Sequence, residues 1–184
     1  MIEARKGKTK TMLNTCLRLA LLLATVIFAG ATVRASAQQS TTATFEDWVV
    51  RCVNRPGPPA KKTCDMEQLT QVKGKNTPLS RVAVTRPAKS APAKMAIQVP
   101  VNIWIPTGIK VQTGSKDAGF AANLMQCIPA GCFADLAITE DMLRQFRTVT
   151  TRGRIVFKNA AQRDIDIPLS FKGFGQAFDA LPKR

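Results

Sequence analysis

Residues 127–132 have the sequence Cys-Ile-Pro-Ala-Gly-Cys, and this segment constrains the fold more than any other part of the chain. Two cysteines enclose a proline and a glycine, with apolar or alternating segments on both sides. The pattern predicts the tip of a β-hairpin that a disulfide ties across its own turn. Closing so small a ring contributes about 2 kcal/mol on the chain-entropy model. The segment therefore predicts a β-rich fold in an oxidising compartment.

The first 37 residues have the three parts of a secretory signal peptide: a basic leader, an apolar run from Leu19 to Ala31, and the small residues Ala35-Ser36-Ala37. The apolar run is short for a bilayer core of about 30 Å. We predict cleavage after Ala37, so that residues 38–184 are periplasmic, associated with the cell envelope or secreted, with no transmembrane span. The alternative is an uncleaved anchor helix.

The positive charge of the protein belongs mainly to the exported part. Residues 38–184 keep 21 of the 27 basic and 11 of the 12 acidic side chains, a net charge of +10. This charge predicts an anionic envelope component, an acidic glycan or an acidic protein as partner, rather than nucleic acid. A surface that only keeps the protein soluble is the alternative. The basic residues expected to contribute are Lys61, Lys62, Arg81, Arg86, Lys89 and Lys94.

Four cysteines remain after cleavage, and they allow three disulfide pairings. Proximity in the sequence favours Cys52 with Cys64 and Cys127 with Cys132. The chain has no histidine, so a zinc site would need all four thiolates, and neither spacing is that of a zinc knuckle. We therefore predict two structural disulfides and no metal site.

Short segments of alternating polarity, separated by turn residues, predict an all-β fold. We expect an antiparallel immunoglobulin-like β-sandwich with two short helices, formed as a single domain by residues 45–184 after a flexible arm at residues 38–44. The expected helices are 140–147 and a C-terminal segment from Phe174 to Leu181. Trp104 is expected to be a buried core residue, with an exposed ligand platform as the alternative. The expected strands are 45–52, 62–70, 79–85, 95–99, 109–113, 119–127, 132–138, 154–158 and 164–171.

The absence of histidine excludes Ser-His and Cys-His nucleophiles and the usual catalytic zinc sites. No glycine pattern for a nucleotide cofactor is present, so no cofactor is expected. Two carboxylate pairs, Asp65 with Glu67 and Asp164 with Asp166, leave one alternative to a non-catalytic interaction protein. This alternative is a periplasmic enzyme that uses carboxylate acid/base residues on acidic glycans.

Several motifs, in the same order along the chain, resemble the invasion-associated locus B family of bacterial envelope proteins. The matching segments are Trp48-Val49-Val50-Arg51-Cys52, Cys64-Asp65-Met66, Pro106-Thr107-Gly108-Ile109, Cys127 with Gly131-Cys132-Phe133-Ala134, and Leu169-Ser170-Phe171-Lys172-Gly173-Phe174. The resemblance extends over residues 45–181. It implies an exported immunoglobulin-like β-sandwich, linked in pathogenic members to entry into host red cells, and it implies no catalytic residues.

We expect the mature protein to begin at Gln38, because the tripartite leader ends at a signal-peptidase site. The intact mass of the protein from an osmotic-shock fraction should equal that of residues 38–184 with two disulfides. Recovery of the full-length chain from the membrane fraction would contradict the prediction.

Overall fold

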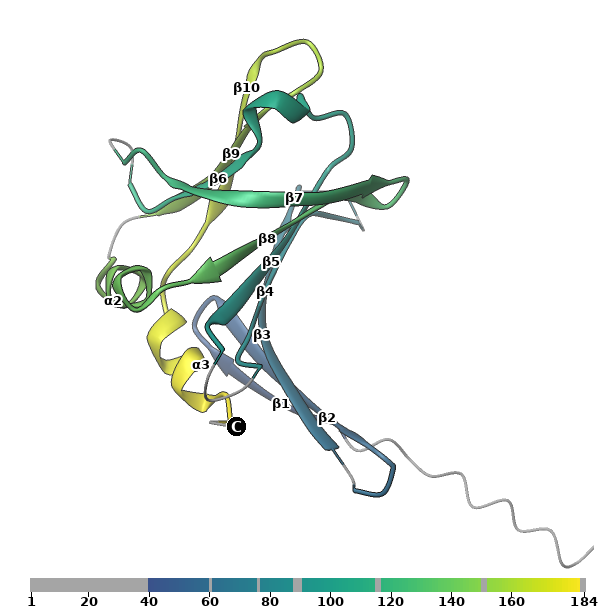
Figure 1. Ribbon diagram of the computed structural model, residues 1–184, viewed down its shortest axis with the longest axis vertical. Coiled ribbons are helices and arrows are strands. Elements are labelled where there is room, and N and C mark those ends of the chain that lie inside the picture. Colours follow the sequence, from purple (N-terminus) through teal and green to yellow (C-terminus); the bar gives the residue numbers. More distant parts are fainter. Residues whose placement is uncertain are drawn as a thin grey trace, which may run out of the picture. The chain divides into compact units, whose positions relative to one another are not determined.

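The computed structural model describes residues 40–59, 61–75, 77–87, 91–114, 117–149 and 152–182. Antiparallel strands dominate this part of the chain, with short helices between and after them (Figure 1). The elements are β1 (Ser40–Phe45), β2 (Trp48–Arg55), β3 (Lys61–Gln71), β4 (Pro78–Thr85), β5 (Ala93–Val99), η1 (Ile105–Thr107), β6 (Ile109–Gln112), β7 (Phe120–Ile128), β8 (Gly131–Ile138), α2 (Glu140–Thr148), β9 (Gly153–Lys158), β10 (Asp164–Leu169) and α3 (Phe174–Ala180).

The strands form one continuous sheet in the order β1-β2-β3-β4-β5-β8-β7-β6-β9-β10. Strand β7 connects the two parts of the sheet, because its first residues pair with β6 and its later residues pair with β8. The register shifts between Leu124 and Gln126, where the pairing of β7 with β8 is interrupted. Figure 1 shows the sheet curling, with α2 and α3 on the same side of it.

Alternating polarity explains why these segments are strands with one buried face. In β5, Ala93, Met95, Ile97 and Val99 are buried, whereas Lys94 and Ala96 between them are exposed. Because side chains alternate across a strand, a period of two places the apolar set on the inner face. The all-β fold with two short α-helices is therefore confirmed.

Aromatic side chains fill the space between the helices and the inner face of the sheet. The ring of Phe174 in α3 meets Trp48 of β2 edge to face at 5.3 Å between centroids. Phe146, from α2, stacks on Phe171 at 4.8 Å and meets Phe174 edge to face at 5.4 Å. Thr139 caps α2, since its hydroxyl accepts a hydrogen bond from the backbone N–H of Met142. Both predicted helices therefore cover the core.

Two finer expectations differ from the structure. An immunoglobulin-like sandwich is not confirmed, because β7 joins all the strands into one curled sheet. The flexible arm predicted for residues 38–44 is wrong from Ser40 on, because Ser40–Phe45 pairs along its length with β2. Backbone hydrogen bonds hold this polar strand, and they require no apolar side chains.

Trp104 is 37% exposed, so the prediction of a buried core residue is also wrong. Its backbone N–H donates to the carbonyl of Lys158 at 2.7 Å, and its neighbour Ile103 bridges to Asn159 and is buried. Alternation along this extended segment turns Ile103 inward and Trp104 outward.

Gln68 of β3 joins the first half of the sheet to the segment after β10. Its amide nitrogen donates to the carbonyls of Ser170 at 3.0 Å and Asp47 at 3.2 Å, and its amide oxygen accepts from the N–H of Ser170 at 2.8 Å. The Gln68 side chain is buried, so water does not replace these bonds when they are lost.

We expect Gln68→Leu to reduce the free energy of unfolding by about 2 kcal/mol, because the substitution leaves the backbone N–H of Ser170 without its partner. Denaturant unfolding of the oxidised mature protein measures the change. The control Gln126→Leu, at an exposed position in β7, should change stability by less than about 0.5 kcal/mol. Equal effects of the two substitutions would show that the bonds of Gln68 contribute nothing specific.

Candidate functional site

The structure confirms both predicted disulfides. The Sγ atoms of Cys52 and Cys64 are 2.06 Å apart, and those of Cys127 and Cys132 are 2.00 Å apart. Each disulfide joins residues that face each other in an antiparallel pair: β2 with β3, and β7 with β8. Each therefore ties one hairpin close to its turn.

Two of the six predicted basic contacts are engaged within the sheet. Arg81 donates to the buried carboxylate of Glu67 at 2.5 Å, and Arg51 approaches the other oxygen of the same carboxylate at 3.0 Å. Lys94 donates to Asp135 at 2.8 Å. These ion pairs lie on the outer face of the sheet and neutralise part of its positive charge.

Arg86 follows β4, and its guanidinium lies over the ring of Phe178 in α3, 4.2 Å from the centroid. Its Nη1 atom is buried and has no hydrogen-bond partner in the described part of the chain. The cation-π contact stabilises the packing of α3. Lys89, another of the six predicted basic contacts, lies outside the described residues.

Lys61 and Lys62 begin β3, and the register of the hairpin brings them against two residues of β2. Arg55 faces Lys61, and Asn54 faces Lys62. We call Arg55, Lys61 and Lys62 the basic hairpin end; all three are exposed. Neither Arg55 nor Lys61 has a carboxylate within ion-pair distance among the described residues. The sequence prediction missed Arg55, because its place opposite Lys61 depends on the register of β2 with β3.

The carboxylate pairs that the sequence suggested as catalytic candidates are also held by neighbouring cations. On β10, Asp164 contacts Lys158 at 2.7 Å and Asp166 contacts Arg154 at 3.1 Å. Partial burial, followed by the nearby negative charge of Glu67, raises the pKa of Asp65, against the opposing effects of Arg51 and Arg81. Among the described residues, no cluster of three or more His, Cys, Asp or Glu side chains is arranged to hold a metal.

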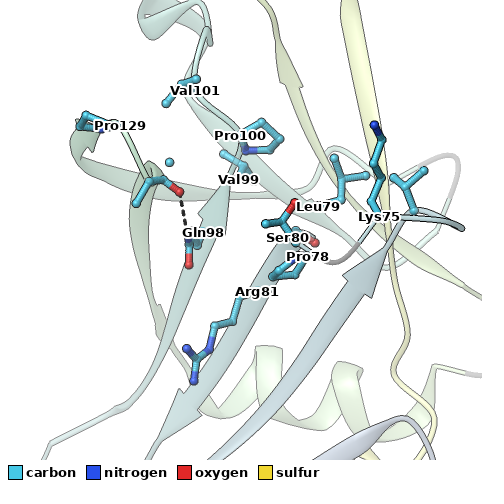
Figure 2. A pocket seen from close by; sticks show the side chains of 14 residues that line it. Lys75, Pro78, Leu79, Ser80, Arg81, Gln98, Val99, Pro100, Val101 and Pro129 are labelled. Carbon is cyan, nitrogen blue, oxygen red and sulfur yellow. Dashed lines mark hydrogen bonds between the residues drawn. The ribbon is translucent and has the colours of Figure 1, made fainter.

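A groove of about 520 Å³ lies at the opposite end of β3 from the basic hairpin end. Leu79 and Lys75 line one side, and Val101 and Pro129 line the other (Figure 2). Pro78 and Pro100 also contribute to its surface, and we call it the proline groove. The sequence prediction did not find this groove, because its walls come from three separate connections that only the fold brings together.

Within the described ranges, no helix has the length and apolar character needed to span a membrane.

The described part of the chain is a curled antiparallel β-protein with two disulfide-tied hairpins. The basic hairpin end and the proline groove lie at opposite ends of β3. Both surfaces suit binding.

The family model described as "Invasion associated locus B (IalB) protein" matches residues 48–182, and the chain belongs to this family. Among solved structures, it is similar to the crystal structure of invasion associated protein B from Bartonella henselae, with a TM-score of 0.65 and 20% sequence identity. That match covers 76% of this chain and 92% of the Bartonella chain. No curated protein matches the chain. The family resemblance seen in the sequence is therefore confirmed.

We expect Asp65→Asn to stabilise the protein at pH 7 by less than about 1 kcal/mol, because a raised pKa means that ionised Asp65 is disfavoured in the folded state. The gain should shrink as the pH falls through the raised pKa and vanish well below the usual Asp pKa of about 3.9, where Asp65 is protonated in both states. Urea unfolding across this range measures it. Asp164→Asn, which removes a surface ion pair, should give no gain at pH 7. A loss of stability for Asp65→Asn at pH 7 would contradict the prediction.

Proposed function

We propose that this protein is an exported, non-catalytic interaction module that binds an anionic component of the cell envelope through the basic hairpin end. The leader and the two disulfides support export, since structural disulfides persist in oxidising compartments such as the periplasm. The family is described as invasion associated, and an acidic glycan of a host-cell surface offers the same anionic chemistry.

The pairing of Arg55 with Lys61 carries the proposal. Like charges directly opposite each other on antiparallel strands destabilise the pair, so this arrangement costs the fold stability unless an anion lies between or over them. Elsewhere on the outer face of the same sheet, Arg51, Arg81 and Lys94 have carboxylate partners. Among the described residues, Arg55 and Lys61 lack the carboxylate partners that these other cations have.

The position of the disulfide adds to this argument. Cys52 and Cys64 lie three residues inside Arg55 and Lys61 on their respective strands, so the covalent bond holds the register that places the two cations together. A preorganised cluster of charges loses less conformational freedom on binding than separate mobile side chains do. The basic hairpin end therefore suits an extended anionic surface.

The test compares Arg55→Glu/Lys61→Glu with Lys110→Glu/Lys172→Glu, a control with the same change in charge at exposed positions elsewhere. Retention of the mature protein is measured on phosphatidylglycerol vesicles, lipopolysaccharide and heparin at about 50 and 200 mM salt. We expect the wild type to bind at least one of these, with retention falling as salt shortens the screening length to about 8 Å near physiological ionic strength. The hairpin variant should lose retention and the control should keep most of it.

No retention of the wild type on any of the three surfaces would refute the proposal. An equal loss for both double variants would also refute it, because retention would then follow net charge and not the hairpin end. Arg81 is not used in this test, since its substitution would leave the buried carboxylate of Glu67 with one cation fewer.

A further inference from the structure

The residues that line the proline groove are mostly apolar, and some of them are exposed to solvent. Leu79, Val99 and Pro100 contribute apolar surface, and Val72 and Val101 are 45% and 47% exposed. When a ligand displaces water from such apolar surface, the free energy of the system falls, and this favours binding. A volume of about 520 Å³ is within the range of small-molecule sites.

The wall formed by the β7–β8 hairpin tip is held in place by three features. The disulfide between Cys127 and Cys132 closes the hairpin, and the side-chain amide of Gln98 donates to the carbonyl of Ala130 at 2.9 Å. Gly131 has φ +144°, and a Cβ at this position would lie 2.7 Å from the carbonyl oxygen of Val99. Glycine therefore lets the tip lie directly against β5, and the groove is formed before any ligand arrives.

The backbone of the groove does not suit an extended peptide. Pro78, Pro100 and Pro129 line it, and proline has no N–H to donate to a peptide carbonyl. Strands β4 and β5 pair with each other and with β3 and β8, so they offer no free strand edge for an added strand. A peptide in this groove would bury unpaired backbone groups, whereas an acyl chain has none.

The charges at the groove have one sign. Its charged lining residues are Lys75 and Arg81, and no Asp or Glu is among the described residues that line it. Arg81 is engaged by Glu67, whereas Lys75 is exposed on the turn between β3 and β4. Figure 2 shows Lys75 beside Leu79 on the wall opposite Pro129. An anionic group at the end of an apolar chain would thus meet the ammonium group of Lys75.

We propose that the proline groove binds a single-chain anionic amphiphile, with the acyl chain between Leu79 and Val101 and the anionic head at Lys75. This site is separate from the basic hairpin end and goes beyond the function proposed above. A straight acyl chain fills the apolar floor, and a carboxylate or phosphate head satisfies the lysine at its edge. The disulfide-tied hairpin then has a second role, as one wall of a binding site.

Dodecanoate, decanoate and octanoate, each below its micelle concentration, test the proposal on the oxidised mature protein. Isothermal titration calorimetry measures affinity, and methyl NMR reports whether Val72, Leu79 and Val101 respond. We expect saturable binding that strengthens about threefold to fourfold with each methylene added until the groove is full. Dodecyltrimethylammonium, with the same chain and a cationic head, should bind the wild type at least about fivefold more weakly than dodecanoate.

Two exposed positions provide variants that leave the core unchanged. Val101→Asp should weaken dodecanoate binding by about tenfold or more, because it places a charge in the path of the chain. Lys75→Glu should weaken it by about fivefold, and the control Lys110→Glu, with the same change in charge at an exposed position in β6, should have no effect. Absence of saturable binding would overturn the proposal. So would unchanged affinity in Val101→Asp, or an equal loss in Lys75→Glu and Lys110→Glu.

Discussion

The carbonyl of Ser170 accepts hydrogen bonds from the indole N–H of Trp48 and from the side-chain amide of Gln68, each at 3.0 Å. Ser170 lies between the last strand and α3, so these two bonds connect the beginning of the sheet to its end. Trp48 also supplies the ring on which Phe174 packs. The position of α3, and with it the closed aromatic core, depends on this junction of groups that are more than 100 residues apart in the chain.

Gly173 makes the junction possible on the other side. It has φ +76° at the start of α3, and a Cβ there would collide with the carbonyl oxygen of Phe45. Glycine is the residue that adopts this conformation and permits this approach without strain. Strand β1, which the polar sequence did not suggest, is therefore in contact with the turn that begins α3, and the two ends of the described chain are packed together.

The two disulfides occupy equivalent places in two hairpins, and a candidate binding surface lies beside each. The first holds Arg55 opposite Lys61, and the second holds the tip that forms one wall of the proline groove. Ion pairs on the outer face, among them Glu67 with Arg51 and Arg81, remove other basic residues from the free surface. The positive charge of the chain is thus partly structural, whereas Arg55 and Lys61 lie at ends of strands, where loops commonly carry function.

The sequence by itself determined the strands other than β1, both helices, the two local disulfides and the family. Each of these depends on short-range patterns: alternating polarity, an N-cap before an amphipathic segment, and cysteines close to a turn. Only the tertiary structure decided that β7 joins all strands into one sheet, that Trp104 faces outward, and that Arg86 packs on Phe178. It also decided that Arg55 faces Lys61 and that three distant connections form a groove. These features depend on strand register and on contacts between remote segments, and a local pattern of polarity contains neither.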